Sequence, residues 1–256
     1  MAEATETRPA GVDARLAALR RVAIVPALNE AGSIARVIAE IRSFDPGFEI
    51  VVIDDGSADR TTEIARAGGA HVVRLPFNLG IGGAVQTGFR YAFEHGFDLA
   101  VRLDGDGQHD PAELARILAP VIAGEADIAV GSRFAGERSY RPPRSRRIGI
   151  RLLAWIVSRL VGRRVTDTTS GFQALNRKGI ALFARDYPHD YPEVEATVMV
   201  FKHRLRLTEV PVRMREREHG RSSITAVRSV YYMAKVLLAL FVGSSRRSAV
   251  PREAKE

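Results

Sequence analysis

Two aspartates one residue apart, Asp104 and Asp106, are the residues of this 256-residue chain whose types and spacing point most directly to chemistry. A glycine separates them, and they follow the apolar run at residues 99–103, which predicts a buried strand. A turn at the end of that strand directs both carboxylates out of the sheet. Mg²⁺ and Mn²⁺ prefer such oxygen ligands, keep several waters and complete their coordination with substrate phosphates. The same spacing is typical of an ordinary polar turn, so the pair gains weight only from the rest of the chain.

The composition excludes several classes of protein. The chain has no cysteine, which rules out disulfides, cysteine-ligated zinc, iron–sulfur clusters and thiol nucleophiles. Its six histidines show no His-x-x-x-His spacing, so a zinc hydrolase is not expected. Lys and Arg number 38 against 30 Asp and Glu, a net charge of +8. This balance favours a polyanionic partner, which could be nucleic acid, an anionic membrane surface or a phosphorylated substrate.

The localisation expected from the sequence is cytoplasmic. No stretch reaches the roughly 20 apolar residues that span a bilayer. Residues 1–20 carry acidic side chains and lack the apolar core of a signal peptide.

Apolar runs alternate with amphipathic stretches over the first half of the chain, which predicts alternating strands and helices. Strands are expected at residues 21–25, 49–53, 71–75, 99–103 and 128–131. Helices are expected at residues 34–41 with Ser33 as the N-cap, at 61–67, at 82–95 and from Asp110-Pro111 onward, with a kink at Pro120. This order predicts an α/β fold with a mostly parallel sheet flanked by helices, whose ligands bind at the carboxyl ends of the strands. The polar clusters at 26–30, 54–59 and 104–108 all fall at such ends, so we expect them to share one site.

The predicted organisation has three parts. They are a flexible N-terminal extension at residues 1–20, one α/β domain at 21–225, and an amphipathic helix with a disordered basic tail at 226–256. Within the domain, residues 137–165 form a basic insert, with an arginine-rich loop at 137–147 followed by a helix at 148–161. That helix, which contains Trp155, and the apolar segment at 229–242 are typical of helices lying at a membrane surface. Both also fit as core or dimer-interface helices.

Seven short motifs follow one another along the chain. They lie at residues 26–30 (PALNE), 54–61 (DDGSADRT), 78–84 (NLGIGGA), 104–109 (DGDGQH), 131–133 (GSR), 167–172 (DTTSGF) and 209–223 (EVP through REHGRSS). In this order they resemble the family 2 glycosyltransferases of the GT-A fold, and specifically the branch that transfers mannose or glucose to polyprenyl or dolichyl phosphate. The glycines at 78–84 are superficially similar to a dinucleotide fingerprint, but Val85 stands where its third glycine belongs, so NAD binding is not expected.

The resemblance implies an inverting transferase that moves a hexose from a nucleotide-diphosphate sugar to polyprenyl phosphate at the cytoplasmic face of the membrane. Mg²⁺ or Mn²⁺ would be held by Asp104 and Asp106, with Gln108 as a further ligand, and would neutralise charge on the departing diphosphate. The residues implied to surround the nucleotide are Pro26, Ala27, Asn29, Glu30, Asp54, Asp55, Gly82, Asp104, Gly105, Arg217 and Ser222. Those implied to hold the acceptor phosphate are Arg133, Arg146 or Arg147, Ser170 and Gly171. The implied catalytic set is Asp104, Asp106, Arg133, Glu195 and Arg217, where Glu195 acts as a base or orients other groups. Ser223 stands where a lysine is common in eukaryotic members, which puts one phosphate contact in doubt.

The expected partners are a donor of the GDP-mannose or UDP-glucose type, polyprenyl phosphate, and either an anionic membrane surface or a small membrane-anchoring protein. A family 2 transferase for a soluble or polysaccharide acceptor is the alternative, in which the apolar segments would form a homodimer interface. A basic nucleic-acid-binding module would predict salt-sensitive binding, but it leaves the ordered carboxylate motifs unexplained, so nucleic acid is not an expected partner.

Overall fold

The computed structural model describes residues 12–134, 144–189 and 192–215. They belong to one compact unit, residues 1–220, and a second unit, residues 221–256, lies outside the described residues. The expected helix at 229–242 and the predicted site residues Arg217 and Ser222 therefore stay untested predictions.

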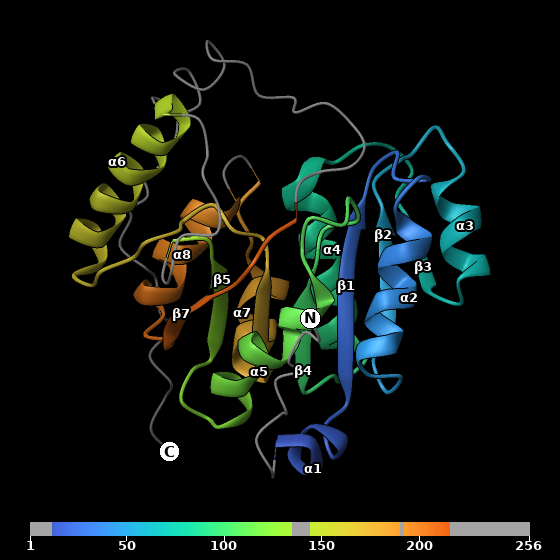
Figure 1. The fold of residues 1–256 in the computed structure, drawn as a ribbon, viewed down its shortest axis with the longest axis horizontal. Coiled ribbons are helices and arrows are strands. Elements are labelled where there is room, and N and C mark those ends of the chain that lie inside the picture. The colour runs from blue at the N-terminus through green and yellow to red at the C-terminus, as the bar shows by residue number, and fades with distance from the viewer. Residues whose placement is uncertain (1–11, 135–143, 190–191, 216–256) are drawn as a thin grey trace, which may run out of the picture. The chain divides into compact units, whose positions relative to one another are not determined.

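Within the described part of the chain, the strands form one seven-stranded sheet in the order β3-β2-β1-β4-β6-β5-β7 (Figure 1). The strands are β1 Arg21–Ala27, β2 Glu49–Asp54, β3 His71–Arg74, β4 Leu99–Arg102, β5 Ile128–Ser132, β6 Gln173–Asn176 and β7 Leu207–Pro211. Neighbouring strands are parallel except at β6, which runs antiparallel to both β4 and β5. The prediction of a mostly parallel α/β sheet is confirmed.

Helices cover both faces of this sheet. They are α1 Val12–Ala17, α2 Ile34–Phe44, α3 Thr61–Ala67, α4 Gly80–Glu94, α5 Leu114–Ile122, α6 Arg144–Val161, α7 Arg177–Arg185 and α8 Pro192–Lys202, with a 3-10 turn η1 at Pro111–Glu113. Alternate residues of a strand face opposite sides, so Ala23 and Val25 of β1 pack in a core with α2 and α5. Val22 and Ile24 pack in a second core with α4, α7 and α8.

The chain order creates a crevice between β1 and β4. From β1 the sheet is extended on one side by β2 and β3, whereas β4 pairs with β1 on its other side. The strand order therefore reverses between β1 and β4, whose carboxyl ends lead into the connections to α2 and α5. Ligands of open α/β sheets bind in the crevice that such a reversal opens.

The N-terminal extension contains the short helix α1, and its Leu16 is only 3% exposed because it packs in the core with α2 and α5. Two local expectations need correction. Residues 144–147, expected in a loop, already belong to α6. Ser33 does not cap α2 with its side chain; its hydroxyl donates instead to the Glu30 carboxylate (2.8 Å) and to the carbonyl of Gly105 (2.7 Å).

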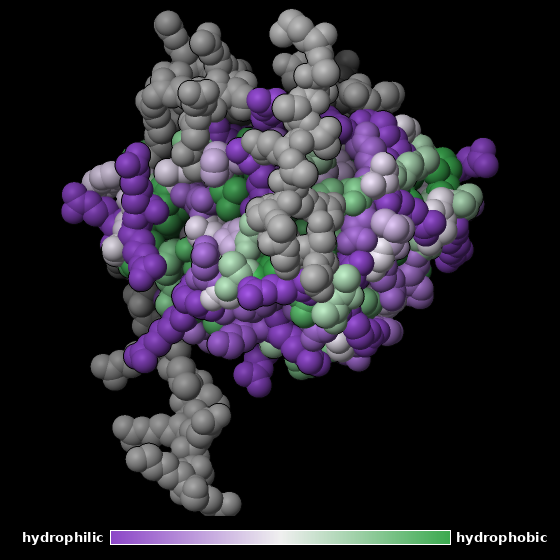
Figure 2. Space-filling view, turned by 60° about the horizontal axis from the view of Figure 1, so that its bottom comes forward, coloured by the Kyte–Doolittle hydropathy of each residue, from purple (hydrophilic) through white to green (hydrophobic). Residues whose placement is uncertain are grey.

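The surface in view in Figure 2 is mainly hydrophilic, with small apolar patches between the charged groups. Exposed apolar side chains on α6 include Leu152, Trp155 and Leu160. In the described residues, no helix has both the length and the apolar character that crossing a bilayer requires.

Candidate active site

A cleft of about 340 Å³ lies where the sheet order reverses, at the carboxyl ends of β1 and β4. Its described lining residues are Pro26, Ala27, Leu28, Glu30, Asp55, Asn78, Gly80, Ile81, Ala84, Arg102, Asp104, Gly105, Asp106 and Glu193. Five of them are carboxylates and one is an arginine, so this lining has a formal charge of −4 when every group is ionised. The structure thus brings together the three polar clusters, as their positions at strand ends predicted, and the motif at residues 78–84 lines the same cleft.

The acidic loop after β4 is fixed by hydrogen bonds to its surroundings. The Gly105 N–H donates to the carbonyl of Pro26 (3.2 Å), and the Gly105 carbonyl accepts from Ser33. A Cβ at Gly105 would stand 3.1 Å from the Pro26 oxygen, so a glycine allows the two loops to approach this closely. Gly107 has φ +75°, a conformation that side chains other than glycine rarely adopt.

His109 is buried beneath this loop and holds it in place through a hydrogen bond. Its ring is 4% exposed and stacks on Phe172, with the ring centroids 4.9 Å apart. Burial lowers the pKa of His109, so the ring is neutral at neutral pH and its Nδ1 accepts from the N–H of Asp104 (3.0 Å).

Asp104 and Asp106 are the groups in the cleft best suited to hold a divalent cation. The Asp104 side chain is 32% exposed, and an oxygen of Asp106 accepts from the Gln108 N–H (3.0 Å). The Gln108 side chain is not among the described lining residues, so its role as a ligand stays a prediction. No group of three or more His, Cys, Asp or Glu in the described residues is arranged to hold a metal by itself. Two hard carboxylates fit an ion that completes its coordination with water and substrate phosphate.

The adjacent carboxylates at the end of β2 have different surroundings. Asp55 lines the cleft, accepts from the Leu79 N–H (2.7 Å), and has its pKa raised by burial. Asp54 is fully buried and accepts from the Ser57 N–H (2.8 Å) and the Thr62 hydroxyl. Burial alone would raise the pKa of Asp54, but these hydrogen bonds outweigh it and the pKa lies below its usual range. Asp55 is therefore the better placed of the two to contact a ligand.

Two other predicted nucleotide contacts shape the cleft instead of lining it. Asn29 has φ +57° and its side-chain oxygen accepts from the Ala58 N–H (2.8 Å), which ties the loop after β1 to the loop after β2. Gly82 was expected to let a nucleotide approach the backbone. A Cβ at Gly82 would stand 2.5 Å from the carbonyl oxygen of Pro188, so the glycine serves the packing of α4 against that segment.

Two charged residues of the cleft, Arg102 and Glu193, were not predicted from the sequence. Arg102 is 1% exposed, and its Nη2 donates to Oε1 of Glu193 (2.9 Å). A signal was available, because a cation inside an apolar strand needs a partner when it is buried. The predicted base, Glu195, lies two residues further along α8 and is not among the described lining residues.

Of the predicted acceptor residues, Arg133, Ser170 and Gly171 belong to the described residues and are not among those that line the cleft. Arg133 donates through Nε and Nη2 to Asp167 (2.8 and 2.9 Å) and through Nη2 to the Thr169 hydroxyl. Ser170 is buried, and a Cβ at Gly171 would stand 3.3 Å from an oxygen of Asp104. The side chains of Arg146 and Arg147 lie outside the described ones.

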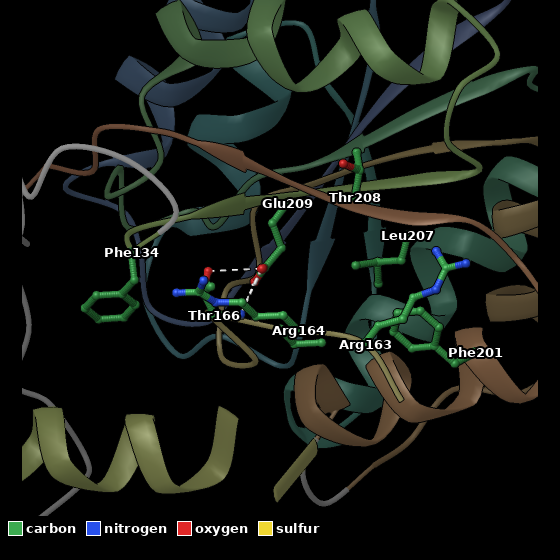
Figure 3. A pocket seen from close by; sticks show the side chains of 9 residues that line it. Phe134, Arg163, Arg164, Thr166, Phe201, Leu207, Thr208 and Glu209 are labelled. Carbon is green, nitrogen blue, oxygen red and sulfur yellow. Dashed lines mark hydrogen bonds between the residues drawn. The ribbon is translucent and has the colours of Figure 1, made fainter. Parts of the chain in front are cut away.

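A second cavity, of about 550 Å³, lies between β7, α8 and the segment after α6 (Figure 3). Its lining includes Arg163, Arg164 and Glu209. Burial raises the pKa of Glu209, and its carboxylate accepts from the N–H and hydroxyl of Thr166 and from the N–H of Asp167. This carboxylate therefore fixes the segment that presents Asp167 to Arg133.

The fold is that of known glycosyltransferases. The structure matches that of glucosyl-3-phosphoglycerate synthase from Mycobacterium tuberculosis in complex with Mn²⁺, UDP and phosphoglyceric acid with a TM-score of 0.72. The match covers 93% of this chain and 83% of that one, at 22% identity. The match shows that this chain has the GT-A fold.

Sequence comparison identifies the family. The model described as glycosyl transferase family 2 matches residues 22–182, and the chain belongs to this family. It is 31% identical to the undecaprenyl-phosphate mannosyltransferase of Micrococcus luteus over 81% of this chain and 88% of the relative. It is 32% identical to the polyprenol monophosphomannose synthase of Mycolicibacterium smegmatis, over 80% and 81% respectively. It is 28% identical to the UDP-N-acetylglucosamine–dolichyl-phosphate N-acetylglucosaminyltransferase of Methanococcus voltae, over 86% and 95%.

Proposed function

We propose that this enzyme is an inverting transferase that moves one hexose from a nucleotide-diphosphate sugar to polyprenyl phosphate, with Mg²⁺ or Mn²⁺, while bound peripherally at the cytoplasmic face of the membrane. The relatives named for polyprenyl or dolichyl phosphates match over most of their length as well as most of this chain. This extent of similarity supports the acceptor class.

The negative charge of the cleft is the observation that supports the proposed dependence on a metal ion. Five carboxylates and one arginine line it, yet the proposed donor has a diphosphate. Two unit charges 4 Å apart interact by about 4 kcal/mol at an effective dielectric constant of 20. A diphosphate therefore needs a divalent cation beside it to enter this cleft, and Asp104 and Asp106 are the residues that would hold the ion. Such an ion would stabilise charge on the leaving diphosphate as the bond to the sugar breaks.

The chain's own residues would orient the two substrates. Asp55 accepts hydrogen bonds, and the loop from Pro26 to Glu30 offers backbone groups to the nucleoside. The positive charge of the Arg133 guanidinium, which Asp167 and Thr169 hold in place, would attract an acceptor phosphate. The acceptor phosphate is already anionic near neutral pH, so attack on the anomeric carbon needs no strong base.

The test is a transfer assay with purified full-length protein. Labelled GDP-mannose, UDP-glucose and UDP-N-acetylglucosamine are each incubated with polyprenyl phosphate and Mn²⁺, Mg²⁺ or a chelator, and the label is extracted into organic solvent. We expect lipid-extractable label from one donor, lost with the chelator and in Asp104→Asn. The matched control is Asp98→Asn, at the opposite end of β4, where the carboxylate contacts Arg177 (3.3 Å). Transfer only to water-soluble acceptors would reject the lipid acceptor, and transfer that survives the chelator would reject the metal.

A further inference from the structure

The buried guanidinium of Arg102 lies among the acidic groups of the cleft. Its Nη1 donates to the Tyr187 hydroxyl (3.1 Å), and its Nη2 donates to Glu193 (2.9 Å) and lies 3.5 Å from Oδ1 of Asp104. The Arg102 side chain is 1% exposed. Arginine stays protonated in proteins, so this site holds a permanent positive charge.

Packing fixes the position of this charge. Arg102 ends β4, where it pairs in register with Ile24 of β1. A Cβ at Gly171 would stand 2.8 Å from Nη2 of Arg102 and 3.0 Å from its Cζ, so the guanidinium fills the space that this glycine leaves. Glu193 lies in the first turn of α8. The Arg102 side chain therefore contacts the loop after β4, the segment before β6, the segment after α7, and α8.

This arrangement is not the one that stability alone would favour. The Nε of Arg102 is buried and makes no hydrogen bond to any described group, and a buried unsatisfied donor costs free energy. Replacing a buried ion pair by apolar groups is often neutral or stabilising. A charge kept at this cost, 3.5 Å from a predicted metal ligand, points to a role in binding.

We propose that Arg102 is a positioning residue that makes metal binding depend on the nucleotide. It holds Glu193 in the cleft and restrains Asp104. Because its charge has the same sign as a divalent cation, it weakens the binding of the free ion to Asp104. It attracts a diphosphate, so the ion and the nucleotide bind more tightly together than either does alone. The proposal rests on the proposed function for the identity of the nucleotide diphosphate.

Binding measurements test this coupling without any transfer reaction. The affinity for Mn²⁺ alone is measured by electron paramagnetic resonance of the free ion, and the affinities for GDP and UDP are measured by calorimetry with and without Mn²⁺. In Arg102→Gln we expect Mn²⁺ alone to bind about fivefold or more tightly, as Coulomb's law predicts for the loss of a nearby like charge. The nucleotide that the wild type prefers should bind more weakly in the presence of Mn²⁺, so the coupling falls.

Matched variants separate this role from a structural one. Tyr187→Phe keeps the charge and removes one hydrogen-bond partner, so its Mn²⁺ affinity should equal that of the wild type. Arg206→Gln removes an arginine paired with Asp127 (3.1 Å), outside the lining of the cleft, and should change stability without changing either affinity. If Arg102→Gln fails to fold, Arg102→Lys keeps the charge and shortens the reach to Glu193. It should then bind Mn²⁺ as the wild type does and the nucleotide more weakly.

Two results would overturn the proposal. One is weaker or unchanged Mn²⁺ binding in a folded Arg102→Gln protein, and the other is tighter Mn²⁺ binding in Arg102→Lys. If the wild type binds neither GDP nor UDP with Mn²⁺, the proposed function fails. The measurement with Mn²⁺ alone still decides whether Arg102 opposes the ion.

Discussion

Gly171→Ala tests the contact between Arg102 and the acidic loop most directly. The added methyl carbon would stand 2.8 Å from Nη2 of Arg102, 3.0 Å from its Cζ and 3.3 Å from Oδ1 of Asp104. Carbon and nitrogen atoms in contact lie about 3.5–4.0 Å apart, so the guanidinium must move by roughly 0.5 Å or more. It has little freedom to move, because it donates to Glu193 at 2.9 Å and is fully buried.

The expected cost combines overpacking with a weakened charged hydrogen bond. Overpacking of a buried site costs about 1–3 kcal/mol, and each kcal/mol lowers the melting temperature of a chain of this size by about 2–4 °C. Chemical denaturation gives the change in the free energy of unfolding, and calorimetry with Mn²⁺ and the nucleotide gives the change in binding, which we expect to weaken.

The control for this substitution is Gly68→Ala, at the end of α3. Its methyl group would lie 3.3 Å from the Ile38 Cδ1 and 3.4 Å from the Ala65 carbonyl oxygen, distances larger than the 2.8 Å at Gly171, so its effect on stability should be smaller, about 0.5 kcal/mol. Adding Gly171→Ala to Arg102→Gln should cost less than the sum of the single changes, because the shorter side chain leaves room. A Gly171→Ala protein as stable as the control, with unchanged nucleotide binding, would refute the described position of the guanidinium.

Three other outcomes are expected. Hydrogen bonds from Arg206 lower the pKa of Asp127 in the folded protein. They therefore stabilise the fold above the ordinary carboxyl pKa of about 3.9. This stabilisation is lost as the pH falls through the lowered pKa of the folded state. Asp127→Asn should therefore be about 1.5–3 kcal/mol less stable at pH 7, and denaturation at decreasing pH should show the difference from the wild type shrinking; a constant difference would contradict the pairing. Gly88→Ala should lower stability by about 1–3 kcal/mol, because its Cβ would stand 2.2 Å from the Ile24 Cγ2. This loss should exceed the gain of about 1 kcal/mol in helix propensity. An unchanged denaturation midpoint would show that α4 does not pack so closely on β1. Asp106→Asn should reduce Mn²⁺-dependent nucleotide binding at least about tenfold while binding without metal stays as weak as in the wild type, and an equal affinity for the nucleotide with Mn²⁺ would exclude this carboxylate as a ligand.

The strands and helices of the first half of the chain could be predicted because their pattern is local. Apolar runs such as residues 50–53 are buried on both faces of the sheet, and α2 buries Ile34, Val37, Ile38 and Ile41 at the predicted spacing. The shared site followed from the same reasoning, since polar residues after parallel strands meet at one edge of the sheet. The second half gave weaker signals. β6 is as long as β3 and β4, but its antiparallel direction depends on distant partners in β4 and β5.

The sequence by itself therefore determined the α/β class, the pairing of carboxylates after β4 and the resemblance to family 2. The side chains that face the cleft were decided only by the tertiary structure. Asp54 and Asp55 are adjacent and of the same residue type. Asp54 accepts a hydrogen bond within its own loop, whereas Asp55 lines the cleft. Glu193 and Glu195 differ in the same respect, because Glu193 lines the cleft and Glu195 does not. Residues two positions apart on a helix point in different directions. Local pattern fixes the elements, but the direction of a polar side chain depends on partners far away in the chain, as the contact of Arg102 with Glu193 illustrates.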